Sequence, residues 1–242
     1  MQLLNDLYFL ITNYYTLFLD GIKITLILAS VGTAGGVIIG LAIYFFKSMT
    51  INFKDNFLKR ILKRIFSWLA TAYVDIIRGT PMIVQASIFY YGFAARLNID
   101  VLAAALIIVS FNTAAYIAEI IRSGVISLGD GSLEAAQSLG LSRFKAMRYV
   151  IFPQVLKNSL PSLLNELIVN VKDSAVLSVI GLGELFYSGR AASSENYMQE
   201  QTFLLIAIIY FIITFSLSRT ITYLINRTTN SKTDFQIKSI ST

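Results

Sequence analysis

The sequence predicts an all-α protein, a polytopic membrane bundle of about five transmembrane helices in a single domain that covers residues 1–242. Composition is the first reason: 55% of the 242 residues are hydrophobic and 14% are charged, whereas a soluble domain carries about 25% charge. The second reason is that apolar residues form runs of about 20 residues, the length that a helix needs to cross a bilayer. The third is that lysines and arginines lie between these runs, where membrane topology explains them better than a nucleic-acid partner does.

Five apolar runs are the predicted spans, at residues 21–46, 57–91, 101–121, 152–180 and 203–225. In the first, Gly32, Gly36 and Gly40 recur every fourth residue, which favours close helix packing within the bundle; a contact between subunits is the alternative. The second opens with alternating apolar and basic pairs, as in a helix that starts at the membrane interface. Gly79 and Pro81 predict a hinge near its end. The fourth span is more polar than the others.

Basic residues predict the orientation of these spans. The segments 47–66 and 122–149 and the C-terminal end from Arg219 hold 14 of the 20 lysines and arginines, while the opposite side holds only Lys23, Arg96 and Arg190. Since cytoplasmic loops of membrane proteins are enriched in Lys and Arg, the three rich segments are predicted to be cytoplasmic. Five spans then place the N-terminus outside and the C-terminus in the cytoplasm. The first residues lack the basic region and the early cleavage site of a signal peptide.

Several kinds of chemistry are excluded by the residues that the chain lacks. It has no cysteine and no histidine, so it offers no thiol or disulfide chemistry, and it lacks the commonest general base and transition-metal ligand. It also lacks the Gly-x-x-x-x-Gly-Lys-[Ser/Thr] loop that binds nucleotide phosphates, so it cannot hydrolyse ATP alone. We expect no catalytic residue, no metal and no cofactor.

A polar segment, residues 122–152, separates the third and fourth spans and contains the run Glu134-Ala135-Ala136-Gln137-Ser138-Leu139-Gly140. Ser132 is predicted to cap a short helix, with Glu134 near the positive end of that helix. Gly140 suits the left-handed residue that ends it, and Ser142 is predicted to cap a second short helix. An ordinary capped loop and a docking element are both compatible with these residues.

Three motifs in this order resemble the polar amino-acid permeases of the ABC importer superfamily. They are Arg-Gly-Thr-Pro-Met-Ile-Val-Gln at residues 78–85, Glu134-Ala135-Ala136 with Gly140 and Pro153, and Lys-Asp-Ser-Ala-Val-Leu-Ser-Val-Ile-Gly at residues 172–181. Val150, Phe152 and Ala175 stand where the family pattern has Ile, Leu and often Ser. The resemblance covers about residues 15–226 and is specific for the family rather than for one substrate.

This resemblance implies the type I ABC importer permease fold, placed in the lipid bilayer of the bacterial cytoplasmic membrane. It implies that a dimer of separate ABC ATPase subunits docks at Glu134, Ala135, Ala136 and Gly140. An extracytoplasmic solute-binding protein is expected to deliver a small polar amino acid. A second permease subunit, identical or related, is expected to line the same path. The implied mechanism is alternating access, driven by the partner ATPases.

Polar residues of the fourth span gather on one face. At 100° per residue, Asn158, Ser162, Asn165 and Glu166 lie within a single polar face of the helix. Such side chains usually face the bundle interior or a water-filled path, because charges in lipid are costly. Two interpretations follow: these residues line the substrate pathway, or they pair with one another or with a neighbouring subunit.

Five other charged residues in or beside the spans are candidates for a gate or for a structural role: Asp75, Arg78, Glu119, Lys172 and Asp173. Asp75 and Arg78 are one helical turn apart, as are Glu119 and Arg122, so local pairing is favoured in both cases and a gate is the alternative. Lys172 and Asp173 lie at the outer end of the fourth span, where a structural role is the alternative.

Three other classes of function are the alternatives. A permease of the same superfamily for another small solute, such as an oxyanion or a metal complex, is opposed by the motifs at residues 78–85 and 172–181. An ATP-independent secondary transporter is expected to contain inverted repeats, and we find no duplication between the halves of the chain. A membrane enzyme would need a nucleophile or an acid–base cluster, for which the chain has no histidine or cysteine.

Overall fold

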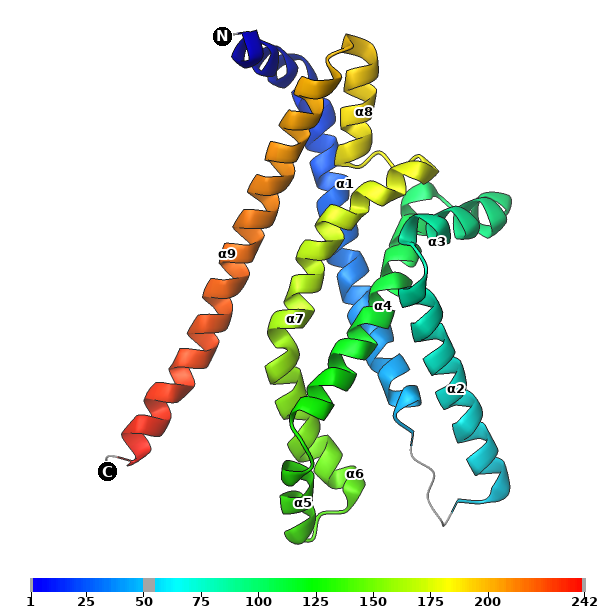
Figure 1. The fold of residues 1–242 in the computed structure, drawn as a ribbon, viewed down its shortest axis with the longest axis vertical. Helices are drawn as coiled ribbons and strands as arrows, with labels where there is room; N and C mark the ends of the chain where they lie inside the picture. Colours follow the sequence, from blue (N-terminus) through cyan, green and yellow to red (C-terminus); the bar gives the residue numbers. More distant parts are fainter. Residues whose placement is uncertain (1, 50–54, 241–242) are drawn as a thin grey trace.

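The computed structural model describes residues 2–49 and 55–240, with side chains described as far as Arg227. All regular elements in these residues are helical, which confirms the predicted fold class (Figure 1). The α-helices are α1 (Gln2–Lys47), α2 (Phe57–Gly79), α3 (Met82–Phe89), α4 (Val101–Ser127), α5 (Gly131–Ser138), α6 (Arg143–Ala146), α7 (Phe152–Asp173), α8 (Leu185–Asn196) and α9 (Gln199–Ile240). Short π- or 3-10-helical segments are η1 (Tyr90–Ala94), η2 (Ala95–Leu97), η3 (Met147–Ile151) and η4 (Ser174–Ile180).

Helices α1 and α4 pack closely along the face of α1 that carries Gly32, Gly36 and Gly40. A Cβ atom added at Gly36 would lie 2.6 Å from Thr113 Cβ, and one added at Gly40 would lie 2.7 Å from the carbonyl oxygen of Ala114. Such distances are far below ordinary van der Waals contact, so only glycine permits this approach of the two backbones. The glycine repeat therefore serves packing within the bundle, as favoured.

Helix α1 is much longer than the predicted first span, which starts at residue 21. Leu10 and Phe18 are buried in an apolar cluster with Leu185 of α8 and Leu205 of α9. Burial of these side chains stabilises the early turns of α1. Helix α8, which was not predicted, closes the same cluster.

Three helices in the described residues are long and apolar enough to cross a membrane by length and composition: α1, α4 and the part of α9 at Gln199–Arg227. Helices α2 and α7 start at the end of the molecule that holds α5 and α6 and run toward the other end (Figure 1), but they carry more charged residues for their length. The predicted second span is divided between α2 and α3, and α3 turns away from the direction of α2 (Figure 1). The predicted fourth span is α7 continued by η4.

The break between α2 and α3 is held by the side chain of Gln85. Its amide nitrogen donates to the carbonyl oxygens of Ile77 at 2.8 Å and Thr80 at 3.0 Å, on the other side of the break. Its amide oxygen accepts a hydrogen bond from Asn112 of α4 at 2.9 Å. Gln85 thus joins carbonyl groups left unpaired at the end of α2 to the central helix of the bundle.

The two ends of the molecule hold different elements. The start of α1 and helix α8 lie at one end, while α5, α6 and the end of α9 lie at the other (Figure 1). The segment 122–152 and the last helix therefore emerge on the same side of the bundle, and the first turns of α1 emerge on the opposite side.

Candidate functional site

The loop between α4 and α7 forms a helix, a sharp turn and a second helix. Gly140 has a φ of +84°, as predicted for a left-handed residue that ends a helix. Its N–H donates to the carbonyl of Gln137 at 2.9 Å, and the N–H of Leu141 donates to that of Ala136 at 3.2 Å. These two bonds form a Schellman motif, which satisfies the last carbonyls of α5. Ser142 caps α6 as predicted, because its hydroxyl accepts from the N–H of Lys145 at 3.4 Å.

The predicted cap at Ser132 is wrong. Helix α5 begins at Gly131, and Asp130 precedes it without a capping side-chain hydrogen bond. The carbonyl of Asp130 already accepts from the N–H of Glu134 at 2.8 Å. Ser132 is therefore inside the first turn, where its own backbone conformation is helical and unsuitable for a cap.

The two alanines of this loop face different ways. Ala136 is buried against the protein itself, whereas Glu134 and Ala135 are exposed. Leu139 is 85% exposed and Phe144 is 67% exposed, and neither was among the predicted docking residues. Exposed apolar side chains that gather in one patch can mark a contact surface, and Leu139, directly before Gly140, was the available signal in the sequence.

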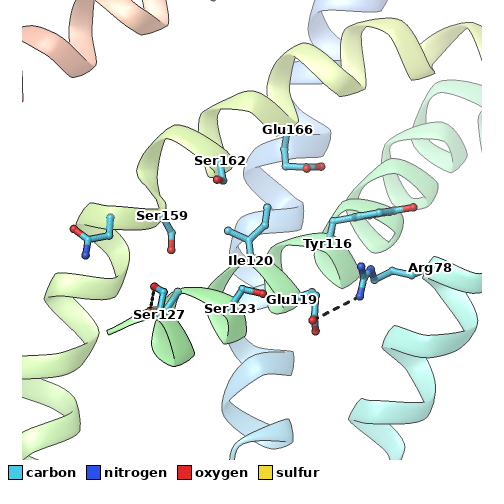
Figure 2. Close-up of a pocket in the computed structure, with 11 residues that line it drawn as sticks. Arg78, Tyr116, Glu119, Ile120, Ser123, Ser127, Ser159, Ser162 and Glu166 are labelled. Atoms are coloured by element: carbon cyan, nitrogen blue, oxygen red, sulfur yellow. Dashed lines mark hydrogen bonds and ion pairs between the residues drawn. The ribbon is translucent and has the colours of Figure 1, made fainter. Parts of the chain in front are cut away.

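A polar pocket lies between α2, α4 and α7 and has a volume of about 450 Å³. Its lining includes Arg78, Tyr116, Glu119, Ile120, Ser123, Gly124, Ser127, Asn158, Ser159, Ser162 and Glu166. Figure 2 shows these side chains approaching one another from three helices. The pocket thus brings together Asn158, Ser162 and Glu166 of the predicted pathway with Arg78 and Glu119 of the predicted gate. Its size falls in the range of roughly 300–1,000 Å³ that is typical of small-ligand pockets.

Glu119 is the centre of a charge cluster on one wall of this pocket. It accepts hydrogen bonds from Arg122 at 2.5 and 2.9 Å, as the helical spacing predicts. Lys47 lies 3.5 Å away and Arg78 lies 3.8 Å away. Three cations therefore share one carboxylate, and the cluster keeps a net positive charge. The guanidinium of Arg78 also lies 5.8 Å from the ring centroid of Tyr116, a cation–π distance.

The favoured pairing of Asp75 with Arg78 is wrong. Arg78 reaches across to Glu119 of α4, while Asp75 is exposed and has no ion pair within residues 2–49 and 55–227. Asp75 and Arg78 are one turn apart on α2, but Arg78 contacts the carboxylate of Glu119 in the charge cluster beside the pocket. A partner on another helix is not visible in the spacing of one helix.

Glu166 reaches the pocket from α7 and is half-buried. Within the described residues its side chain has no hydrogen bond or ion pair, and the same holds for the side chains of Ser162 and Asn158. The side chains of α7 in the pocket therefore keep their donors and acceptors available for water or a ligand. Figure 2 shows Glu166 and Arg78 reaching this space from different helices.

The other predicted polar residues lie outside the pocket lining. Asn165 and Lys172 are exposed, and Asp173 is half-buried at the end of α7. Asn170, on the edge of the same polar face, is buried and makes structural contacts. Its amide donates to Thr33 of α1 at 2.8 Å and to Thr113 of α4 at 2.9 Å. Part of the polar face of α7 therefore holds the bundle together.

Of the pocket residues that α4 contributes, only Glu119 was predicted, and the others were missed. Tyr116, Glu119, Ser123 and Ser127 follow one another at spacings of three and four residues, which places them on one face of a helix. A plot of the third span, like that of the fourth, would have revealed this second polar face.

Comparison with known proteins places this geometry in a family. The family model described as "Binding-protein-dependent transport system inner membrane component" matches residues 56–230. The "Glutamine transport system permease protein GlnP" of Escherichia coli (strain K12) is 36% identical over 205 residues, which cover 84% of this chain and 88% of that protein. The "Arginine transport system permease protein ArtQ" of Bacillus subtilis (strain 168) is 34% identical over 197 residues, which cover 81% and 84%.

Solved structures give the same result. One described as "Crystal structure of an amino acid ABC transporter with histidines" has a TM-score of 0.79 and 36% identity, and the match covers 90% of this chain and 96% of that one. An inward-facing conformation of the MetNI methionine ABC transporter has a TM-score of 0.67 at 21% identity, covering 86% and 95%. The second likeness concerns the fold alone.

Proposed function

This chain belongs to the family of binding-protein-dependent transport system inner membrane components and is the permease subunit of an amino-acid ABC importer; we propose that the pocket between α2, α4 and α7 carries its polar amino-acid substrate. The chain is a multi-pass inner-membrane component and not a catalytic subunit. Its family implies an ATPase and a solute-binding protein as partners.

The observation that carries this proposal is the presence of both charge signs in one pocket between the helices. The guanidinium of Arg78 and the carboxylate of Glu166 both line the pocket, together with the hydroxyls of Ser123 and Ser162. A free amino acid is a zwitterion, and it needs a cationic group for its carboxylate and an acceptor for its ammonium. Arg78 can serve the carboxylate because a guanidinium has five donors and Glu119 contacts only one of its nitrogens, at 3.8 Å. Glu166 and the hydroxyls are then the acceptors for the ammonium group.

We propose that the partner ATPases dock at α5. Glu134, Ala135 and the neighbouring Leu139 are exposed on this helix, and Gly140 fixes the turn that follows it. Ala136 lies on the opposite, buried face of α5 and packs this helix against the rest of the chain. The Schellman motif makes this element stiff, so that movement of a docked ATPase is passed on to α4 and α7. The ATPases alone hydrolyse ATP.

We propose that the N-terminus lies outside and that α5, α6 and the C-terminus lie in the cytoplasm. The asymmetry of basic residues supports this orientation. The arrangement of the ends in Figure 1 is compatible with it, because α5 and the end of α9 share one side. A second permease subunit, identical or related, would cover the exposed polar face of α7 that includes Asn165. Each chain then contributes one permease domain, residues 1–242.

The substrate assignment is tested by replacing the pocket carboxylate. Glu166→Gln keeps the shape of the side chain and removes only its charge. We expect it to weaken uptake of arginine more than uptake of glutamine, because arginine carries a second cationic group besides its ammonium group. Glu195→Gln, the same change at an exposed residue of α8, is the matched control. Competition between the two amino acids is measured in vesicles that contain the complete importer. An unchanged preference in Glu166→Gln at normal expression would return Glu166 to a structural role.

A further inference from the structure

The first turns of α2 divide into a cationic half and an apolar half that transport does not explain. At 100° per residue, the cations Lys59, Arg60, Lys63 and Arg64 occupy one half of the helix, and Phe57, Leu58, Ile61, Leu62 and Ile65 occupy the other. The apolar side chains are not covered by the protein: Phe57 is 80% exposed and Leu58 is 66% exposed. This end of α2 therefore needs an environment with both charge and hydrocarbon.

The end of α1 fixes the level at which these turns lie. The carbonyl oxygen of Lys47, the last residue of α1, accepts a hydrogen bond from Ser67 at 3.1 Å. Beside it the rings of Phe46 and Phe66 stack, with centroids 5.4 Å apart. At 1.5 Å per residue, the first residue of α2 lies about 15 Å beyond this level. The cations thus lie past the end of a membrane-spanning helix, at the depth where lipid headgroups are expected.

Next to the Phe46–Phe66 stack, α1, α2 and α4 form an apolar pocket of about 280 Å³, here called the seam pocket. Its walls include Ile39 and Ile43 of α1, Phe66 and Ala70 of α2, and Phe111 of α4. Tyr73 also lines it, and its hydroxyl donates to the carbonyl of Phe111, so the phenol is satisfied without a ligand. The seam pocket is therefore suited to hydrocarbon and not to a polar solute.

The cations and the seam pocket lie on one face of α2. Lys59, Lys63, Phe66, Ala70 and Tyr73 follow one another at spacings of three or four residues, so they form one stripe along the helix. Lys63 contacts Asp55 at 2.6 Å. Within the described side chains, no carboxylate pairs with Lys59, Arg60 or Arg64. From the start of α2 onward, the stripe thus begins with cationic side chains and continues along the wall of the apolar seam pocket.

We propose that this stripe, together with Arg60 beside it on the cationic half of the helix, binds an anionic phospholipid. The phosphate lies at Lys59 and Arg60, and part of one acyl chain lies in the seam pocket. The charge of the stripe is complementary to a phosphate, and clustered basic residues beside a membrane span attract anionic lipids. The apolar lining distinguishes a lipid from a free phosphate, which has no group to fill it. The proposal needs only that the chain spans a membrane, so it stands apart from the substrate assignment.

The single tryptophan of the chain, Trp68, allows a direct test. The double variant Phe66→Trp, Trp68→Phe moves the fluorophore to the wall of the seam pocket. The full-length chain is reconstituted in phosphatidylcholine vesicles that contain brominated phosphatidylglycerol or the same fraction of brominated phosphatidylcholine. We expect phosphatidylglycerol to quench with a relative association constant about 30-fold higher, the effect of the two basic contacts at Lys59 and Arg60.

Two further variants separate the headgroup from the acyl chain. Lys59→Gln, Arg60→Gln should abolish the preference for phosphatidylglycerol, while Arg227→Gln, an exposed cation of α9, should retain it. Ala70→Phe, which fills the seam pocket, should reduce quenching by phosphatidylglycerol. Equal quenching by the two lipids would overturn the proposal. Absence of quenching by either lipid would also overturn it, since another protein surface would then cover the pocket.

Native mass spectrometry of the chain with its tryptophan unchanged gives a second measurement that does not depend on the moved fluorophore. The expected result is one phosphatidylglycerol retained on the purified wild-type chain and lost from Lys59→Gln, Arg60→Gln. Equal retention by both proteins would contradict the role of the cations.

Discussion

Substitution of Gly140 by valine tests the coupling role of the turn after α5. Gly140 has a φ of +84°, and no atom lies within 4 Å of an added Cβ, so the main cost of a side chain here lies in the backbone conformation. A left-handed conformation costs an ordinary residue about 1–2 kcal/mol. If the turn unwinds instead, it loses the bonds from Gly140 to Gln137 and from Leu141 to Ala136, each with a net value of about 0.5–1.5 kcal/mol. Either route destabilises the docked form by about 1–3 kcal/mol, a fold-change in its population of roughly 5 to 150.

The assay is ATP hydrolysis and amino-acid uptake by the complete importer in vesicles. We expect Gly140→Val to insert and assemble normally, because the bundle core is untouched, and to lose most of the hydrolysis that the loaded binding protein stimulates. Gly140→Asn is the matched control, since asparagine adds a similar bulk but tolerates the left-handed conformation. Normal coupling in the valine variant, or equal losses in the valine and asparagine variants, would refute the argument from backbone strain.

Three more predictions concern packing, topology and the break between α2 and α3. Gly40→Ala should lower the free energy of unfolding by about 1–3 kcal/mol because its Cβ meets the Ala114 carbonyl, whereas Gly92→Ala, with open space around it, should not; similar melting temperatures for both in detergent would contradict this. Ser138→Cys should resist an impermeant thiol reagent added to intact cells, and since the chain has no other cysteine, strong labelling would reverse the proposed orientation. Gln85→Leu should reduce uptake more than expression, because it removes the bonds that hold α3 to α2 and α4; wild-type uptake would show that the break needs no such support.

Local features of the sequence were enough to predict the elements that depend on local chemistry. Gly140 correctly predicted the end of one helix, and Ser142 correctly predicted the start of the next. A left-handed residue and a side-chain cap each depend only on residues within one helical turn, so both can be found in the sequence. The start of α5 was placed two residues late because serine is a good cap, while Asp130 precedes the helix without using its side chain as a cap. The glycine repeat of α1 predicted close packing correctly, although its partner α4 followed only from the structure.

Contacts between helices distant in sequence were not predictable in the same way. The helical spacing predicted an ion pair between Arg78 and Asp75, but in the structure Arg78 pairs with Glu119 of α4. The long side chain of Arg78 extends to a neighbouring helix, and the spacing within α2 does not show where that helix lies. The polar face of α7 was predicted, but the different roles of its residues were not. Glu166 lines the pocket and Asn170 bonds to other helices, and each role depends on which neighbouring helix the side chain contacts. Helix α8 was missed because its residues are mixed in polarity, although Glu184, which accepts from the N–H groups of Phe186 and Tyr187, was a signal of its start.

We propose that this chain imports amino acids only when it is coupled to its partners, and ATP-dependent uptake is the measurement that can show this. The permease is reconstituted in vesicles with its ATPase and its binding protein, and accumulation of labelled arginine and glutamine is followed with ATP on the ATPase side. We expect accumulation that requires both ATP and the binding protein and that is lost when either is omitted. Uptake that continues without ATP, or no uptake of any amino acid by the fully assembled importer, would contradict it.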